Sequence, residues 1–405
     1  MQKFTGIIGL LVLLLLAYAL SNNRSKIRWQ LVAWGLGLQL FFALFILKTP
    51  VGQPFFAAID SVIMKLLSFS DAGSDFLFKS FSAGYVEGPL MNFAFRVLPT
   101  IIFFSSLMAV MYYLGIMQWV VKWIARVMQR TLKTSGSETL SVSANIFVGQ
   151  TEAPLMIRPF IAGMTQSELM AVMTGGFATV AGGVMAIYVK MLSDIPGIAG
   201  HLMAASIMSA PAALVIAKII YPETEISETA GDLRISIEKT EDNIMESLSR
   251  GATDGLKLAA NVGAMLIAFV AMIAMINAIL GIVGLTLQQI LGILFSPLAW
   301  AMGAPWNEAH ILGSLMGEKI VLTELIAYSD LSALRLDHAI SDRTAIIASY
   351  ALCGFANFAS VGIQLGGIGG IAPNRRKDLA KLALRAMIGG ALASWLTATI
   401  AGIII

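Results

Sequence analysis

Residues 145–154 read Asn-Ile-Phe-Val-Gly-Gln-Thr-Glu-Ala-Pro and decide the kind of fold that this chain adopts. Gly149 and Pro154 interrupt this stretch, so a continuous helix is not expected here. Between them lie the polar residues Gln150, Thr151 and Glu152. The surrounding segment, about residues 135–165, is too polar to span a membrane and too apolar to be a loop. We therefore predict a helical hairpin that enters a membrane and returns on the same side, where protein or a water-filled cavity satisfies its irregular backbone.

A second interrupted segment covers about residues 287–330. It is expected to break around Gly303-Ala-Pro-Trp306 and again around Gly313-Ser-Leu-Met-Gly317. Polar residues follow the second break, namely Glu318, Lys319, Thr323 and Glu324. This segment predicts a second re-entrant helical hairpin.

Each hairpin is followed by an apolar segment that has a polar interruption of its own. Residues 175–183 read Gly-Gly-Phe-Ala-Thr-Val-Ala-Gly-Gly, and residues 353–362 read Cys-Gly-Phe-Ala-Asn-Phe-Ala-Ser-Val-Gly. The polar residue of the interruption lies 27 residues after Glu152 in one case and 33 residues after Glu324 in the other. Two such units of opposite orientation are typical of inverted repeats in secondary transporters, whose substrate site lies where the broken helices meet. We expect both carboxylates to share one chamber halfway through the membrane.

The composition of the whole chain agrees with a membrane protein. Of its 405 residues, 57% are apolar and only 13% are charged, whereas a soluble chain carries about a quarter charged residues. This excludes a soluble enzyme and a nucleic-acid-binding protein. The single cysteine, Cys353, cannot form a disulfide within the chain, which excludes a disulfide scaffold. No set of nucleophile and base, and no metal-ligand spacing of the three histidines, indicates an enzyme.

The predicted fold is an all-α integral membrane protein with eight transmembrane helices, two re-entrant hairpins in inverted repeats and interfacial helices. Segments of suitable length and hydropathy cover about 4–21, 30–48, 91–114, 168–190, 200–220, 258–283, 341–365 and 385–405. Residues 53–68 and the basic amphipathic segment 116–133 are expected to lie at the membrane surface.

Lysine and arginine in the short loops set the expected orientation. They gather in residues 24–28, 122–133 and 375–385, and all three segments fall on one side if the eight helices alternate. That side is expected to be cytoplasmic, which leaves both termini outside. The acidic loop within 222–250 does not change this orientation, because acidic residues contribute little to it.

The order of these elements suggests a division of the chain into scaffold and transport segments. The scaffold would comprise residues 1–90 and 91–134, and the two transport repeats would be 135–220 and 258–370. Residues 221–257 would form the acidic loop and the start of the sixth span, and residues 371–405 the basic loop and the last span.

Two carboxylates and several neutral oxygens are the candidate site residues. A charge at mid-membrane costs about 2.5–3.5 kcal/mol, so Glu152 and Glu324 are functional candidates. The structural alternative is an ion pair of Glu152 with Arg158 and of Glu324 with Lys319. The neutral polar residues Asn145, Thr179, Asn357 and Ser360 suit Na⁺ or solute hydroxyl groups, or alternatively join packed helices.

Together these motifs resemble the concentrative nucleoside transporter (CNT) family, in its bacterial, sodium-coupled form. The resemblance covers the chain from about residue 30 and is strongest in four motifs. These are Phe95-Arg-Val-Leu-Pro-Thr-Ile-Ile-Phe-Phe104, Gly149-Gln-Thr-Glu-Ala-Pro154, Thr323-Glu-Leu-Ile-Ala-Tyr328 and Ala351-Leu-Cys-Gly-Phe-Ala-Asn-Phe358. The resemblance implies a homotrimer in a bacterial inner membrane, in contact with membrane lipid, with a separate site in each protomer.

The resemblance also implies residue roles. Gln150, Thr151 and Glu152 would bind the nucleobase, Phe355 and Leu258 would flank it, and Glu324, Asn357 and Ser360 would bind the ribose. The Na⁺ site would comprise Asn145, the backbone of Val148, Thr179, Val180 and Val184.

Two positions depart from the family pattern. Thr323-Glu324-Leu325 stands where Asn-Glu-Phe is frequent, and Gly183 stands where serine is common.

The expected function is that of a sodium-coupled symporter that imports nucleosides such as uridine. The expected mechanism is elevator-type alternating access, in which Na⁺ serves as the coupling ion and is not a bound cofactor. Coupling to protons remains an alternative, as does an uncoupled facilitator or channel.

Overall fold

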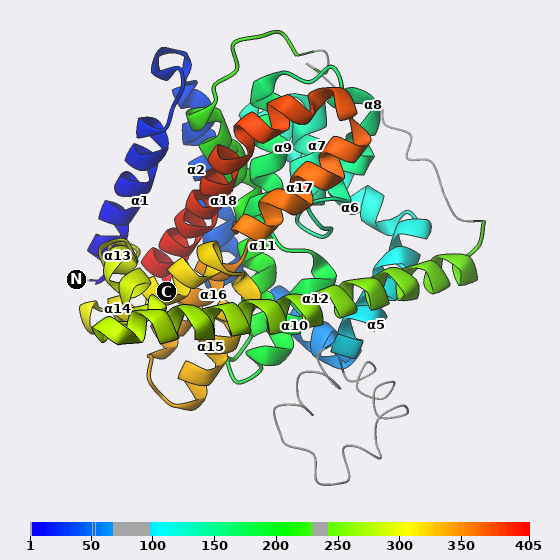
Figure 1. The fold of residues 1–405 in the computed structure, drawn as a ribbon. Helices are drawn as coiled ribbons and strands as arrows, with labels where there is room; N and C mark the ends of the chain where they lie inside the picture. Colours follow the sequence, from blue (N-terminus) through cyan, green and yellow to red (C-terminus); the bar gives the residue numbers. More distant parts are fainter. Residues whose placement is uncertain (1, 51, 53, 68–97, 228, 230–241) are drawn as a thin grey trace.

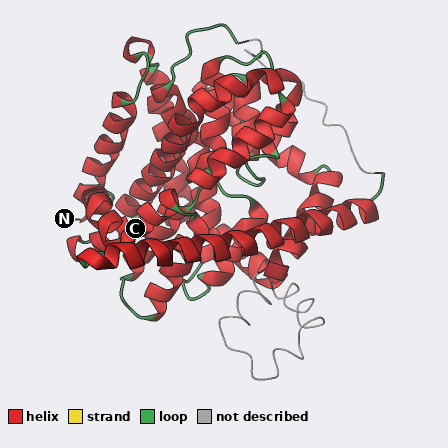
Figure 2. Ribbon diagram, in the orientation of Figure 1, coloured by secondary structure: helices red, strands yellow, loops and turns green. Residues whose placement is uncertain are grey.

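The structure is a computed structural model that describes the chain except for residues 1, 51, 53, 68–97, 228 and 230–241. Within the described residues it consists of helices and loops without any strand (Figure 2). The helices of the first half are α1 (Gln2–Ala19), α2 (Trp29–Lys48), α5 (Leu98–Tyr113), α6 (Ile116–Leu132), α7 (Gly136–Ala144), α8 (Arg158–Ile161), α9 (Gln166–Ala178), α10 (Gly182–Met191) and α11 (Ile198–Ile220). Those of the second half are α12 (Ile244–Leu280), α13 (Leu287–Ala301), α14 (Trp306–Val321), α15 (Glu324–Leu336), α16 (Asp342–Leu352), α17 (Phe358–Ile371) and α18 (Arg376–Ile404). The all-helical expectation is confirmed.

The described helices include several that can cross a membrane. Four segments are long and apolar enough, namely Trp29–Lys48, Gln166–Met191, Ile198–Ile220 and Pro373–Ile404. Two bent pairs add to these: α5 with α6, which meet at 76°, and the end of α12 with α13, which meet at 85°. The expected first span appears as the shorter helix α1, and the expected seventh as α16 and α17, separated by a break.

The first hairpin forms where the sequence predicts it. α7 begins with a capping box in which Ser135 accepts from the backbone N–H of Glu138, and it ends at Ala144. Turns and a short 3₁₀ helix (Ala153–Ile157) then lead into α8. The following span is interrupted between α9 and α10, as expected from its polar stretch.

The second hairpin differs from the expectation. α14 runs without interruption through residues 313–317, and the chain turns at Leu322 and Thr323, between α14 and α15. The glycines serve packing instead, because a Cβ at Gly313 would lie 2.8 Å from the backbone nitrogen of Ser296 in α13. The hairpin therefore consists of α14 and α15, and α13 is a separate helix packed along α14.

The sixth span is longer than expected, since α12 covers 37 residues instead of about 258–283. In Figure 1, α12 extends across the molecule to reach α5. Glycines allow the close approach of the two helices: a Cβ at Gly251 would lie 2.7 Å from the Cα of Ser106, and one at Gly255 2.7 Å from the Cα of Ile102.

The two segments expected at the membrane surface are both helical where described. Residues 54–67 form a helix whose Asp60 accepts from the backbone N–H of Ala199, at the start of α11. α6 buries the side chains Met117, Val121, Ala125, Met128 and Leu132 against the protein. Trp119 and Trp123 lie off this face and are exposed, so they are available to lipid.

The basic loops gather at one end of the bundle. The guanidinium of Arg28 donates to the carbonyl of Lys133, and that of Arg375 donates to the carbonyl of Ala162. At the same end, Lys218 and Glu138 form a buried ion pair of 2.7 Å. This arrangement agrees with the expectation that the three basic segments share one side. The two termini lie near each other in Figure 1; which side of the membrane they face stays a prediction.

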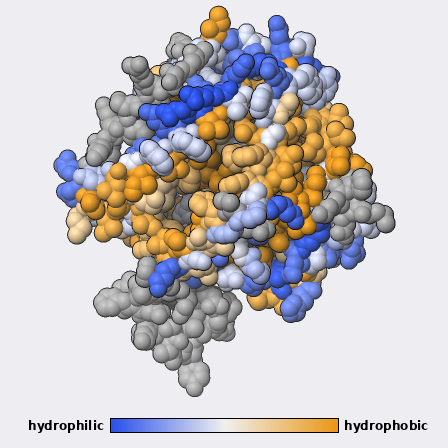
Figure 3. Space-filling view, turned by 180° about the vertical axis from the view of Figure 1, so that it is seen from behind, coloured by the Kyte–Doolittle hydropathy of each residue, from blue (hydrophilic) through white to orange (hydrophobic). Residues whose placement is uncertain are grey.

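The outer surface carries many apolar side chains. Seen from behind in Figure 3, hydrophobic residues cover much of the face, and hydrophilic residues lie mainly toward its rim. Exposed large apolar side chains include Trp34, Phe41, Leu44, Ile279 and Leu294. Such a surface is suited to lipid rather than to water.

Candidate functional site

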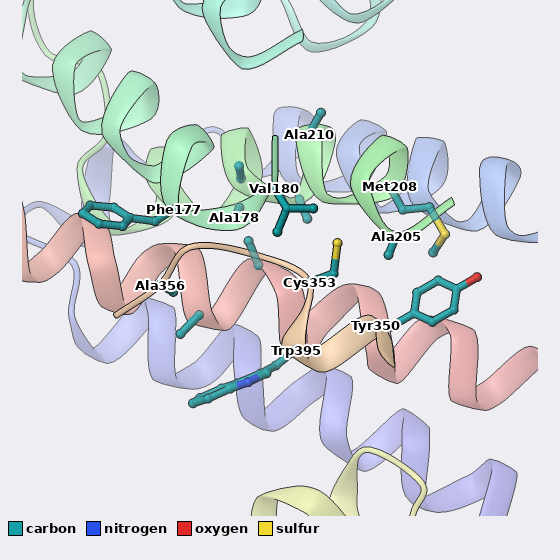
Figure 4. Packing of buried hydrophobic residues seen from close by; sticks show 14 of the residues in the cluster. Phe177, Ala178, Val180, Ala205, Met208, Ala210, Tyr350, Cys353, Ala356 and Trp395 are labelled. Atoms are coloured by element: carbon teal, nitrogen blue, oxygen red, sulfur yellow. The ribbon is translucent and has the colours of Figure 1, made fainter. Parts of the chain in front are cut away.

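The breaks of the two interrupted spans lie in direct contact. The backbone N–H of Phe355 donates to the carbonyl of Thr179 over 3.3 Å. Gly354 has a φ of +149°, and a Cβ there would lie 2.8 Å from the carbonyl oxygen of Phe177. Figure 4 shows apolar side chains of both breaks together, with Phe177 and Cys353 among them. The two predicted interruptions therefore form one structural unit.

Glu324, the first residue of α15, lies at this unit. Its Oε1 accepts from the hydroxyl of Tyr188 over 2.8 Å, and its Oε2 accepts from Nδ2 of Asn357 over 2.7 Å. The side chain is only 5% exposed. Asn357 is fixed in turn, because its Oδ1 caps α17 by accepting from the backbone N–H of Ser360 over 2.7 Å. The structure thus brings together the three residues expected to bind ribose.

Tyr188 completes this group and was not identified from the sequence. It lies on α10, and its ring stacks on that of Tyr328 from α15, with centroids 4.2 Å apart. An ionised carboxylate offers about four lone-pair sites, and the side chains of Tyr188 and Asn357 use two of them. The remaining sites can accept hydrogen bonds from a solute with neighbouring hydroxyl groups.

The tip of the first hairpin reaches α17. Oε1 of Gln150 accepts from Nε2 of Gln364 over 3.0 Å, and the same nitrogen donates to the carbonyl of Met173. Thr151 packs against Gly367, where a Cβ would lie 2.6 Å from its methyl group.

Gln364 is the second residue that the sequence analysis missed. It is fully buried on α17, an otherwise apolar helix. Asn357, Ser360 and Gln364 are spaced by three and four residues, which places them on one side of the helix. This polar stripe was a signal from which Gln364 could have been found.

A cavity of about 380 Å³ lies between the first hairpin and helices α5 and α12. Of the predicted site residues it is lined by Val148, Glu152 and Leu258. Its other polar lining residues include Tyr112, Gln118, Arg250 and Asp254. Gln150, Thr151, Glu324, Phe355, Asn357 and Ser360 are not among its lining residues.

The cavity is lined by only one of the two carboxylates that were expected to share a chamber halfway through the membrane, and the shared chamber stays a prediction. Glu152 is exposed and faces the cavity, whereas Glu324 is buried behind its partners Tyr188 and Asn357. The physical reason is the turn at Gly149, which places Glu152 at the hairpin surface beside water-accessible space. The structural alternative, an ion pair of Glu152 with Arg158, is not formed, although both residues are described.

The residues expected to bind Na⁺ lie on two joined segments. The backbone N–H of Gly182 donates to the carbonyl of Phe147 over 2.9 Å, which joins the end of the first hairpin helix to the break of span four. Asn145 and Val148 lie on one segment, and Thr179, Val180 and Val184 on the other. The hydroxyl of Thr179 donates to the carbonyl of Gly175, so its lone pairs remain available.

The side chain of Asn145 gives the clearest sign of a cation site. It is 1% exposed, and its Nδ2 donates to the carbonyl of Ser141 over 3.2 Å. Its Oδ1 has no hydrogen-bond partner in the described part of the chain, and neither does the buried hydroxyl of Thr174. An unpaired buried acceptor costs about 1–3 kcal/mol, and coordination of a cation removes this cost. The residues present therefore fit Na⁺.

Comparison with known proteins identifies the family. Residues 201–402 match the profile described as "Na+ dependent nucleoside transporter C-terminus", and residues 8–81 match the corresponding N-terminus. Residues 94–195 match a third profile, "Nucleoside recognition". The chain is 44% identical to an uncharacterized transporter of Haemophilus influenzae over 98% of that protein's length. It is 43% identical to the uncharacterized transporter YutK of Bacillus subtilis over its full length.

The chain belongs to the Na⁺-dependent nucleoside transporter family. Solved structures agree with this assignment. The chain superimposes on CNTnw in an inward-facing substrate-bound state with a TM-score of 0.92 at 44% identity, covering 98% of that chain. It superimposes on a CNTnw variant in an outward-facing state with a TM-score of 0.90 at 42% identity, covering the same share.

Membership of this family confirms that the protein is a membrane transporter and not an enzyme. Among the mammalian relatives, the sodium/nucleoside cotransporter 1 of Rattus norvegicus is 43% identical over the whole of this chain. The chain spans 64% of the length of that relative, whereas it matches the bacterial relatives almost end to end.

Proposed function

We propose that this protein is a Na⁺-coupled symporter that imports nucleosides such as uridine by alternating access. The observation that carries the proposal is the buried carboxylate of Glu324, held by Tyr188 and Asn357 beside two broken spans. Charged groups at such a position are retained in membrane proteins where they bind a solute or an ion. The solved inward-facing and outward-facing states of CNTnw support an alternating-access cycle.

The ribose is assigned to Glu324, Asn357 and Ser360. A carboxylate accepts from vicinal hydroxyl groups in charge-assisted hydrogen bonds, each worth about 1.5–3 kcal/mol. Tyr188 and Asn357 hold the orientation of Glu324 without using all of its lone pairs, so the carboxylate can still accept from ribose. We add Tyr188 to this group as the residue that positions the carboxylate.

The nucleobase is assigned to Gln150, Thr151 and Glu152, with Phe355 and Leu258 covering its faces. Amide and hydroxyl groups exchange donors and acceptors with a base edge, and an aromatic face packs on a flat ring. Gln364 joins this set because it already holds the side chain of Gln150.

The coupling ion is assigned to Asn145, Val148, Thr179, Val180 and Val184. The unpaired Oδ1 of Asn145 supports this assignment. Coupling requires that Na⁺ favour the conformation of the hairpin that binds substrate, because a ligand without such a preference shifts no population. An ion between the hairpin and the break of span four would order the tip that carries Gln150.

At the level of the whole protein, we propose a homotrimer in the bacterial inner membrane. The first and second transport repeats, residues 135–220 and 258–370, would move across the membrane against a scaffold formed by residues 1–134. Bacterial relatives of nearly equal length support the localisation. Mass measurement of the purified protein in detergent tests the trimer, and a monomeric mass would contradict it.

Uptake of labelled uridine into proteoliposomes tests the function. We expect accumulation above the external concentration only under an inward Na⁺ gradient. Accumulation driven by a proton gradient alone would indicate a proton symporter, and equilibration without any ion would indicate a facilitator. The Asn145→Ala variant is the matched comparison: we expect it to lose Na⁺ dependence while it still discriminates between bases.

A further inference from the structure

Lys319, on the second hairpin helix α14, is fully buried, with 0% of its side chain exposed. Its Nζ donates to the carbonyl of Ala351 over 2.8 Å and to the hydroxyl of Ser394 over 2.7 Å. The ion pair with Glu324, which the sequence offered as an alternative, is not formed in the described structure. Burial of an ammonium whose hydrogen bonds go to neutral oxygens, with the carboxylate of Glu324 near but not in direct contact, is costly and calls for an explanation.

The partners of Lys319 have counterparts in the first repeat. Ala351 lies in the last turn of α16, directly before the break of span seven, as the last turn of α9 lies before the break of span four. Ser394 lies on α18, the helix that follows the second broken span, and Ser206 lies on α11, the helix that follows the first. Both helices carry a second hydroxyl three residues later, on Ser209 and Thr397.

Contacts support this correspondence. The hydroxyls of Ser209 and Thr397 are hydrogen-bonded to each other over 3.3 Å, so equivalent positions of α11 and α18 meet. Ser206 donates to the carbonyl of Ile146, at the end of the first hairpin helix. Ser394 accepts from Lys319, in the last turn of the second hairpin helix. Each serine thus contacts the end of the hairpin helix that precedes it in the chain.

The two repeats differ in the partners of the buried oxygen atoms near the end of each hairpin helix. In the first repeat the end of the hairpin helix carries the buried Oδ1 of Asn145, which has no partner among the described residues. In the second repeat the carbonyl of Ala351 and the hydroxyl of Ser394 are both filled by the ammonium of Lys319. In the second repeat the cation is thus the ammonium of Lys319. In the first repeat a Na⁺ ion from solution can take the corresponding role beside Asn145.

We propose that Lys319 is a tethered cation that takes, in the second repeat, the place that the coupling Na⁺ takes in the first. This inference rests on the proposed function and extends it. The ammonium holds α14 to the break of span seven and to α18 at every stage, so the second hairpin does not need an ion to dock. Only the first hairpin then responds to Na⁺, and Lys319 acts as a positioning residue for Glu324, five residues further along the chain.

Two uncharged variants of Lys319 distinguish the role of a tethered cation from a role in packing alone. Lys319→Asn offers an oxygen ligand comparable to that of Asn145, whereas Lys319→Met fills similar space without one. The readout is uridine affinity of the purified protein at a series of Na⁺ concentrations. The slope of log affinity against log Na⁺ concentration reports the number of ions bound with the nucleoside.

We expect Lys319→Met to lose uridine affinity by about tenfold or more at every Na⁺ concentration, the loss that follows removal of a charge-assisted hydrogen bond. Its Na⁺ slope stays that of the wild type. Lys319→Asn loses affinity at low Na⁺ and regains it at high Na⁺, with a slope steeper by about one ion. Equal behaviour of the two variants, with monodisperse protein in both, would overturn the proposal.

A variant of the first repeat tests the proposal independently if neither uncharged variant of Lys319 folds. Asn145→Lys places an ammonium at the end of the first hairpin helix, and we expect uridine binding that no longer depends on Na⁺. A remaining requirement for Na⁺ would contradict the tethered-cation role. The wild type is measured first, because uridine binding that is independent of Na⁺ there would contradict the proposed function instead.

Discussion

At the residue scale, the orientation of Glu324 depends on a chain of fixed groups. Asn357 cannot turn away, because its Oδ1 caps α17, so its Nδ2 must point to the carboxylate. Tyr188 is held by its ring stack with Tyr328 and directs its hydroxyl to the other carboxylate oxygen. A binding group positioned in this way loses little entropy when a ligand arrives.

Glu324→Gln is expected to abolish most nucleoside uptake. The amide nitrogen of glutamine would face at least one of two groups that now donate, and Asn357 cannot reverse its amide without losing the cap of α17. Loss of the charge also removes charge-assisted bonds to ribose, each worth about 1.5–3 kcal/mol, so kcat/KM should fall by about 10- to 100-fold.

Glu308→Gln is the matched control, because this half-buried carboxylate on α14 accepts from the hydroxyl of Ser341 and lies outside the candidate site. It should transport normally. Near-normal uptake by Glu324→Gln, with unchanged elution of the purified protein, would remove Glu324 from the site.

The sequence predicted part of this site for a clear reason. Glu324, Asn357 and Ser360 are polar residues in apolar surroundings, where burial without function is costly. Tyr188 gave no such signal, because tyrosine is common in apolar helices and its partner is 136 residues away. The exposure of Glu152 could not be predicted either, since it depends on the direction of a turn at Gly149.

At the scale of the elements, the crossing of the two breaks depends on glycine. Gly354 has a φ of +149°, which disfavours any residue with a side chain. A Cβ there would also lie 2.8 Å from the carbonyl oxygen of Phe177 and 2.9 Å from the backbone of Ala178. Neither backbone segment can give way without breaking the contact between Phe355 and Thr179.

Gly354→Ala should therefore destabilise the protein by more than about 2 kcal/mol, through backbone strain and overpacking together. Gly366→Ala is the matched control, because Gly366 lies in helix α17 with open space at its Cβ position. That change should be neutral or stabilise by up to about 1 kcal/mol. Thermal unfolding in detergent measures both, and equal midpoints would show that the breaks do not require close contact.

Glycine also explains why a break was wrongly expected at residues 313–317 of the second hairpin. Gly313 and Gly317 were interpreted as a break, although an isolated glycine can equally mark close packing of two helices. In the structure both glycines allow close packing, because α13 lies directly against the face of α14 that carries them. Sequence alone cannot separate the two cases, since the neighbour is brought in by tertiary structure. The first hairpin was predicted correctly because Gly149 and Pro154 enclose polar residues, which packing does not explain.

At the scale of the whole molecule, the contact between α5 and α10 is the place where transport motion is expected. α5 belongs to the proposed scaffold and α10 to the first transport repeat. A Cβ at Gly183 would lie 3.6 Å from the hydroxyl of Ser105, and one at Gly182 3.9 Å from the sulfur of Met108. The cavity that contains Glu152 opens along the same contact, with both glycines in its lining.

The basic loops were sufficient to predict which segments share one end of the bundle. The basic segments gather at one end, and a hydrogen bond of Arg28 to Lys133 joins two of them. The motion of the transport repeats relative to the scaffold could not be predicted from the loops. It depends on which interfaces are weak enough to separate, and this is a property of the packed molecule.

A disulfide across the contact of α5 with α10 tests the motion directly. A Cβ at Gly183 would lie 3.6 Å from Oγ of Ser105, so Ser105→Cys with Gly183→Cys places two thiols side by side across this contact. If α10 moves past α5 in each cycle, oxidation should stop uridine uptake and a reducing agent should restore it. The native Cys353 is buried and should not interfere.

The matched control is Ser209→Cys with Thr397→Cys, because these hydroxyls lie 3.3 Å apart on α11 and α18. α11 belongs to the first transport repeat, and α18 packs on α11 and on α9 of the same repeat. We assign α18 to the moving part on this ground, so a bond between α11 and α18 should leave uptake unchanged. Full uptake by the cross-linked Ser105–Gly183 pair would show that α5 and α10 move together. The boundary between scaffold and transport unit would then not lie at the contact of α5 with α10, and α5 would have to be removed from the scaffold.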